Sequence, residues 1–443
     1  MGFAQALRTA GCSTLAGAFL FASAPLAAAD QVREDQWALK ALNAESVWKI
    51  SKGSGVIVAV IDTGVNSSHL DLQGNVLKGK DFLDGGSATP EPGRDQDHGT
   101  AMASIIAGHG HGSNDGVMGL APEAEILPVR DYGTKGPGLP ASIRYAVDNG
   151  ASVINVSQCF DSSSQEELDR TSDAVAYALK HDVLVVGASG NEDDKGGACY
   201  PAASPGALGV GAVKNSGFIW EGSNPGDFVS LTAPGTNIVS ANGLNNGYHA
   251  ANGTSDAAAY TSAAAALLRS KFPDLTAGQI ANRLVKTAAL PDSEKGLSLP
   301  DKRYGYGIIQ PLSALKDNIS AGSKYGPLTV PESLKEKSTA PAFGASAEEQ
   351  ERADQKALII WAVIGLAGLA VIGLVILLIV KRSRRNRNSN GGPAGPGTPI
   401  GYPQYGQQPY PQQNPYHQPV SPQPHNPYQQ QPTPPHSQLP SQE

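Results

Sequence analysis

The chain has 443 residues, of which 40% are hydrophobic, and its formal net charge is −7. This length allows two or three domains and a substantial core. The acidic balance argues against a nucleic acid as partner, because basic residues cluster only at 381–387.

Residues 1–29 have the pattern of a secretory signal peptide. Arg8 precedes the apolar stretch LAGAFLFASAPLAAA, whose last small residues form a cleavage site before Asp30. The sequence therefore predicts export. Residues 30–52 then form an N-terminal strap across the domain, since they are too few for an independently folded propeptide.

Residues 53–318 alternate short apolar runs with helical patterns. Runs this continuous predict strands that are buried on both faces, as in a parallel sheet covered by helices. The stretches 139–150 and 164–181 have helical periodicity, and Gly150 is a typical C-cap signal. We therefore expect an α/β fold with a doubly wound parallel sheet. The predicted strands are 55–61, 124–130, 151–157, 182–189, 207–213 and 227–235.

Polar residues follow three of these strands. Asp62 ends the first, Ser157 and Gln158 follow the third, and Asn191 follows the fourth. Each could close an ordinary turn. In open α/β sheets, however, ligands bind beyond the carboxyl ends of the strands, so we expect these residues to gather at one edge.

The stretch ANGTSDAAAYTSAAAALL (251–268) predicts a helix that begins near Ser255. Ser255 can be the N-cap of this helix, a nucleophile, or both. The exposed N–H groups of a helix N-terminus would stabilise the negative charge that develops when such a nucleophile attacks.

A base and an oxyanion donor are also present in the sequence. Asp62 follows an apolar run, so its carboxylate needs a partner. His98, in DQDHGTAMASIIAG, either bonds only to a helix start or meets that carboxylate through one ring nitrogen. In the second case its other nitrogen is free to take a hydroxyl proton. The amide of Asn191 and the backbone N–H of Ser255 could bind an oxyanion.

The segments VAVIDTGV, DHGTAMASIIAG, VVGASGN and NGTSDAAAY together resemble the four signature segments of the subtilisin-like serine proteases, in that family's order. This resemblance implies that Asp62 orients His98 and that His98 acts as general base and acid. It also implies that Ser255 attacks the scissile carbonyl and Asn191 stabilises the oxyanion. The implied reaction is peptide-bond hydrolysis of polypeptide substrates, without a cofactor.

The resemblance further implies that Ser157 and Gln158 line the primary substrate pocket. Gln158 and Cys159 predict a pocket that is neither strongly acidic nor strongly basic. Cys12 leaves with the signal peptide, so Cys159 and Cys199 form an even pair that suggests a disulfide in an oxidising compartment. Two free buried thiols are the alternative.

Two features need a separate interpretation. Asp256 stands beside Ser255, where the family usually has an apolar residue, and we expect its side chain to point away from the oxyanion because successive helical side chains diverge. In GHGHG, His109 and His111 have no Cys or carboxylate at ligand spacing, so we expect a mobile surface loop and no metal.

The C-terminal part is predicted to anchor the protein. Residues 319–356 have the composition of an extracellular linker. The uncharged apolar run 357–380 is long enough for one transmembrane helix, and the basic residues that follow place the C-terminus in the cytoplasm. Residues 381–443 end in a Pro/Gln/Tyr-rich tail that we expect to be disordered, with or without a cytosolic partner.

This arrangement resembles the mycosins, the membrane-anchored subtilisin-like proteases of type VII secretion systems. It implies a single-pass protein of the cell membrane with an extracytoplasmic catalytic domain, whose partners are the membrane and a type VII secretion complex. Two alternatives are a general surface subtilisin and a structural scaffold of the secretion complex in which catalysis is dispensable.

Overall fold

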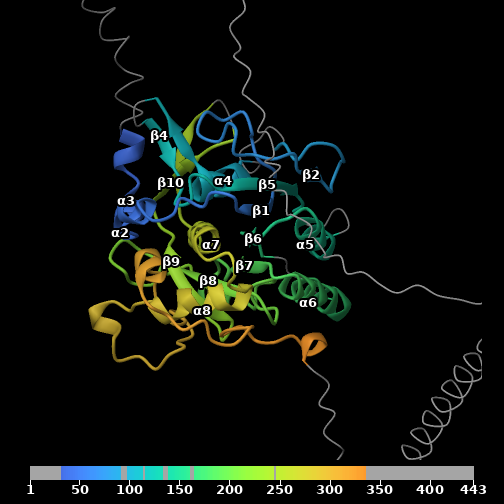
Figure 1. Cartoon of the computed structure of the whole chain (residues 1–443), viewed down its shortest axis with the longest axis vertical. Helices are drawn as coiled ribbons and strands as arrows, with labels where there is room; N and C mark the ends of the chain where they lie inside the picture. Colours follow the sequence, from blue (N-terminus) through green and yellow to red (C-terminus); the bar gives the residue numbers. More distant parts are fainter. Residues whose placement is uncertain are drawn as a thin grey trace, which may run out of the picture. The chain divides into compact units, whose positions relative to one another are not determined.

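Figure 1 shows the computed structural model of the chain, which describes residues 31–335 apart from 91–96, 113–114, 133–137, 160–163 and 244–245. The predicted signal peptide (1–29), transmembrane helix (357–380) and tail (381–443) lie outside the described residues. Within the described part, the structure has no helix that is long and apolar enough to span a bilayer.

A seven-stranded parallel sheet forms the centre of the domain, which confirms the predicted fold class. Its order is β2-β5-β1-β6-β7-β8-β9, so β1 lies between β5 and β6 and the order of the strands reverses there. All six predicted strands are present. The strands are β1 (Ile57–Asp62), β2 (Lys80–Asp81), β5 (Glu125–Arg130), β6 (Val153–Val156), β7 (Leu184–Ala188), β8 (Leu208–Val213) and β9 (Val229–Pro234).

Both faces of the sheet are covered, because strand side chains alternate between them. On β1, Val58 and Val60 enter one apolar core, whereas Ala59 and Ile61 enter the other. Helices α4, α7 and α8 contribute to the first core, and α5 and α6, which lie together in Figure 1, to the second. The helices are α2 (Trp37–Ala41), α3 (Ala44–Trp48), α4 (His98–Ala107), α5 (Leu139–Asp148), α6 (Gln165–Lys180), α7 (Thr254–Lys271), α8 (Ala277–Thr287) and α9 (Pro311–Lys316).

Short elements lie outside the main sheet. Two antiparallel hairpins pair β3 (His109–His111) with β4 (Asp115–Met118), and β10 (Ile238–Ala241) with β11 (Tyr248–Ala251). Neither hairpin was predicted from the sequence. Three single turns of 3₁₀ helix are η2 (Asp193–Lys195), η3 (Asp292–Glu294) and η4 (Glu332–Leu334).

The N-terminal strap is fixed to the domain through two indole groups. Trp37 Nε1 donates to the carbonyl of Thr236 at 2.9 Å, and Trp48 Nε1 donates to that of Leu120 at 2.9 Å. The buried side chains of Leu39 and Val47 belong to the larger core. The described part of the strap is therefore an integral part of the folded unit.

The beginning of the expected linker is also folded onto the domain. Leu328 is buried, and Asn282 of α8 donates to the carbonyl of Ser320 at 3.0 Å. Thr276 contributes a further bond to the carbonyl of Lys324 at 2.5 Å. Described residues after the boundary predicted at 318 thus also pack on the domain.

A buried ion pair joins the end of β5 to β2. Arg130 Nη1 lies 2.6 Å from Asp81 Oδ2 and 2.7 Å from Asp84 Oδ2, and both Arg130 and Asp81 are buried. Arg130→Met would leave Asp81 buried without its cation, so we expect the free energy of unfolding to fall by about 3–5 kcal/mol. Urea denaturation of a Ser255→Ala background, which excludes self-digestion, measures this loss.

The matched control for this prediction is Lys302→Met. Lys302 and Asp227 form an exposed pair at 3.6 Å, and exposed pairs contribute little. Its unfolding midpoint should therefore hardly move. Equal effects of the two substitutions would contradict the importance of the buried pair.

Candidate active site

Asp62 and His98 are brought together by the end of β1 and the start of α4. Asp62 is fully buried, and its two carboxylate oxygens lie 2.8 and 2.9 Å from His98 Nδ1. Gly99 allows this approach, because a Cβ on it would lie 2.3 Å from the carbonyl oxygen of Gly64. The N–H of Thr63 donates to Asp62 Oδ1 at 2.7 Å, which further fixes the carboxylate.

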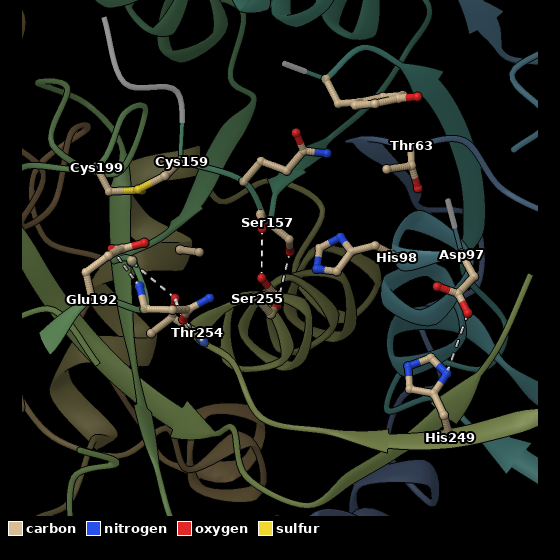
Figure 2. A pocket seen from close by; sticks show the side chains of 15 residues that line it. Thr63, Asp97, His98, Ser157, Cys159, Glu192, Cys199, His249, Thr254 and Ser255 are labelled. Atoms are coloured by element: carbon tan, nitrogen blue, oxygen red, sulfur yellow. Dashed lines mark hydrogen bonds and ion pairs between the residues drawn. A yellow bond between two sulfur atoms is a disulfide. The ribbon is translucent and has the colours of Figure 1, made fainter. Parts of the chain in front are cut away.

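Ser255 lies in the first turn of α7, and the N-cap interpretation is wrong. The helix begins at Thr254 with Gly253 as N-cap, and Ser255 Oγ donates to the carbonyl of Ser157 at 2.7 Å. Figure 2 shows the imidazole of His98 turned toward Ser255. Because Nδ1 is held by Asp62, Nε2 is the nitrogen available for the serine hydroxyl.

The surroundings of His98 are strongly negative. Burial lowers the pKa of His98, because it opposes the charged form of the imidazole. This effect is outweighed by the charge and hydrogen bond of Asp62 and by the charges of Asp256 and Asp97. The net result is a pKa of His98 that is raised to about 9. The imidazole is therefore mostly protonated at neutral pH. Its basic form predominates only above about pH 9.

Asn191 is oriented by Thr254, the residue before the serine. The backbone N–H and the hydroxyl of Thr254 both donate to Asn191 Oδ1, each at 2.9 Å. With its oxygen engaged in this way, the amide offers its Nδ2 group as a donor to the pocket that Asn191 lines. Sequence reasoning missed Thr254, although it lies within the NGTSD segment.

The sequence-predicted residues other than Asp62 line one pocket of about 460 Å³. Its lining includes His98, Ser157, Gln158, Asn191 and Ser255, while Asp62 lies buried behind His98. The remaining described lining residues are Thr63, Asp97, Tyr132, Cys159, Ala188, Gly190, Glu192, Cys199, His249 and Thr254.

The segment around Ser157 is tied to α7. Ser157 Oγ donates to the carbonyl of Ser255 at 3.1 Å and accepts from Asn155 Nδ2 at 2.8 Å. Ser262 Oγ, on α7, donates to Asn155 Oδ1 at 2.9 Å. The role of Asn155 in this wall could not be predicted, because Asn155 lies inside a predicted strand.

The predicted disulfide is confirmed. Cys159 and Cys199 are bonded, and both line the pocket. Figure 2 shows the bond near Glu192, on the opposite side of Ser255 from His98. The bridge therefore links two parts of the pocket wall that are distant in sequence.

The histidines of GHGHG do not lie in the expected mobile loop. They belong to β3, where His109 Nε2 contacts the carbonyl oxygen of Gln73 at 2.9 Å and His111 Nδ1 lies 2.5 Å from Asp71 Oδ1. Asp71 is fully buried and lies far from them in sequence, so their spacing could not reveal it. Among the described residues, no group of three His, Cys, Asp or Glu side chains could hold a metal ion.

Comparison with known proteins identifies the family. The family model described as "Subtilase family" matches residues 53–307, a range that contains Asp62, His98, Asn191 and Ser255. The chain belongs to the subtilase family. It is a subtilisin-like serine protease, and its similar proteins include secreted and intracellular proteases as well as mycosins.

Three of these similar proteins illustrate the identity and coverage of the matches. The minor extracellular protease Epr of Bacillus subtilis is 32% identical over 66% of this chain, which spans only 43% of Epr. Mycosin-1 of Mycolicibacterium smegmatis is 32% identical over 67% of this chain and 76% of its own length. The solved structure of the MycP3 protease from the type VII (ESX-3) secretion system is 32% identical, covers 64% of this chain and 88% of its own, and has a TM-score of 0.55.

Proposed function

We propose that this subtilase is a membrane-anchored serine endopeptidase that hydrolyses peptide bonds outside the cytoplasmic membrane through Asp62, His98 and Ser255. The observation that carries the proposal is the contact of His98 Nδ1 with the fully buried Asp62 at 2.8 Å, with the imidazole turned toward Ser255. This is the arrangement in which a histidine activates a serine hydroxyl.

Catalysis begins when the hydroxyl of Ser255 turns from the carbonyl of Ser157 toward His98 Nε2. His98 takes its proton as Ser255 Oγ attacks the scissile carbonyl, and Asp62 stabilises the imidazolium without taking the proton. The oxyanion receives hydrogen bonds from Asn191 Nδ2 and from the backbone N–H of Ser255 at the start of α7.

The tetrahedral intermediate then collapses. His98 gives its proton to the leaving amine, which leaves the acyl group on Ser255. Water enters, loses a proton to His98 and attacks the ester, and the second product is released as the hydroxyl of Ser255 is restored. Each step requires only residues of this chain and water.

The proposed location rests on the ends of the sequence and on the relatives. Residues 1–29 predict export, and residues 357–380 predict a single span with the C-terminus in the cytoplasm. Mycosins are among the relatives, and MycP3 is named as a protease of a type VII secretion system. We therefore propose that the protease is associated with such a system and acts on its exported polypeptides.

A fluorophosphonate probe tests the proposed chemistry, because it reacts only with an activated serine. The intact membrane protein should be labelled, and Ser255→Ala should abolish the label. Absence of label on the folded protein at pH 9 would contradict the proposal. If secretion survives in Ser255→Ala but fails when the whole chain is deleted, a scaffold role exists beside hydrolysis.

The proposed orientation is tested by protease protection of intact cells. Added protease should remove the domain that contains Ser255 and leave an epitope at the end of the 381–443 tail intact. Digestion of the tail from outside would reverse the orientation.

Removal of the oxyanion donor should slow catalysis without unfolding the domain. Asn191→Ala is expected to lower kcat by about 10²–10³, the loss measured for this donor in a member of the same family. Steady-state kinetics at pH 9 measures it, and a thermal melt checks folding. Full activity in Asn191→Ala would exclude the amide from the oxyanion site, and unfolding would assign it a structural role.

A further inference from the structure

We propose that the pocket around Ser255 selects a lysine or arginine side chain of the substrate on its His98 side, and that Asp97 is the carboxylate that binds this side chain. The inference rests on the proposed endopeptidase function and gives it a substrate class. It differs from the expectation of a neutral pocket, which considered only Gln158 and Cys159.

The described lining of the pocket contains acidic side chains but no lysine or arginine. Asp97 and Glu192 both line the pocket, whereas no lysine or arginine belongs to its described lining. The only other titratable nitrogen groups there are the imidazoles of His98 and His249. When His98 is in the neutral form that acts as a base, a pocket with this composition attracts cations and repels anions.

The carboxylates of Glu192 and Asp97 differ in how far they are already engaged by other residues. Glu192 Oε2 accepts from the backbone N–H of Asn191 and from Asn224 Nδ2, both at 2.9 Å, so this carboxylate is already used to hold the wall. Among the described residues, the one ion-pair contact of the Asp97 carboxylate is with His249 Nδ1 at 3.9 Å, which is too long for a hydrogen bond. Asp97 is therefore the carboxylate that is free to bind a substrate cation.

Asp97 is also placed to bind such a cation with a gain in free energy. Its side chain is only 22% exposed, so much of its hydration has been lost, and no described residue forms a strong ion pair with it in return. Figure 2 shows Asp97 and His249 together on the His98 side of Ser255. Because His98 lies against the bond that is cleaved, a side chain that reaches Asp97 must belong to a residue close to that bond.

The negative groups around His98 support the same inference. Asp256 is 2% exposed, and its Oδ1 has no hydrogen-bond partner in the described part of the chain. Together with Asp62 and Asp97 it favours the charged imidazole in spite of burial. A field that stabilises one cation in the pocket also stabilises a lysine ammonium or an arginine guanidinium there.

The experiment uses sets of fluorogenic peptides. Within each set the peptides differ at one position, which is lysine, glutamine or glutamate. One set is made for each of the three positions on either side of the cleaved bond. We expect at least one position at which kcat/KM for lysine exceeds that for glutamate by about tenfold or more, mainly through KM. Asp97→Asn should reduce this ratio to below about threefold, and 0.5 M salt should weaken it in the wild type. Asp227→Asn, which removes an equal charge from an exposed surface pair, should leave it unchanged.

Binding provides a test that does not depend on catalysis. In the Ser255→Ala variant, fluorescence anisotropy should show that the lysine peptide binds more tightly than the glutamate peptide, and Asp97→Asn added to it should abolish the difference. If fluorophosphonate labels Ser255 but no position prefers lysine, or if Asp97→Asn leaves the preference unchanged, the inference is overturned and the proposed function stands. If no label appears while the lysine peptide still binds preferentially, the proposed function fails instead.

Discussion

Replacing Ser255 with alanine should lower kcat by about 10⁶-fold and leave the fold intact. The size of this loss is the one measured for the nucleophile of a member of the same family. The residual rate comes from binding and the oxyanion donors, which the variant keeps. Structurally, the substitution removes only the hydrogen bond to Ser157, so stability should fall by about 1 kcal/mol. Kinetics at pH 9 and a thermal melt measure the two effects.

Ser270→Ala is the matched control on the same helix. Ser270 is half-buried near the end of α7 and donates to the carbonyl of Ser54 at 2.9 Å, and it does not line the pocket, so its loss should leave kcat unchanged. Adding His98→Ala to Ser255→Ala should cause no further fall, because the two residues act as a unit. A Ser255→Ala variant that keeps more than about 1% of the activity would contradict a nucleophilic role.

The main sheet could be predicted because its strands are buried on both faces. Continuous apolar runs such as 55–61 leave few alternatives to a covered parallel strand, and all six runs became strands. The edge and hairpin strands lack that signal. β2 has two residues and β11 is mostly half-buried, so their pairing depends on neighbours that the local sequence does not contain.

The sequence could predict those site residues whose positions are determined by the topology of the parallel sheet. Asp62, Ser157 and Asn191 follow parallel strands, whose carboxyl ends meet at one edge of the sheet. The exact start of α7 was not predictable, because Gly253, not Ser255, has the extended conformation of the N-cap. As a result the hydroxyl of Ser255 is free for the pocket instead of being used on its own helix.

The surroundings of the pocket depend on contacts between distant segments. Asp97 meets His249 only because the β10–β11 hairpin brings β11 to the start of α4. A single sequence contains no signal for such a pair. The acidic character of the pocket therefore emerged only from the structure.

Asp256→Asn should move the pH profile of kcat/KM to lower pH. In the wild type, the negative groups around His98 keep it protonated up to about pH 9, so activity should rise with pH as the imidazole loses its proton. Burial raises the pKa of Asp256 to about 7, against the opposing effect of His98, so this carboxylate is largely ionised where His98 titrates. Without its charge the imidazolium is less stable, the pKa of His98 falls, and activity at neutral pH increases.

The sign of this shift separates an electrostatic role of Asp256 from a packing role. Loss of packing alone would lower activity at every pH and leave the midpoint of the acidic limb in place. Loss of a negative charge beside His98 moves that midpoint down, whereas the rate on the alkaline plateau, where His98 is already neutral, should stay close to that of the wild type. Asp227→Asn, with the same change in net charge at the surface, should reproduce the wild-type profile. An unchanged midpoint in a folded Asp256→Asn variant would mean that the buried carboxylate does not act on the base.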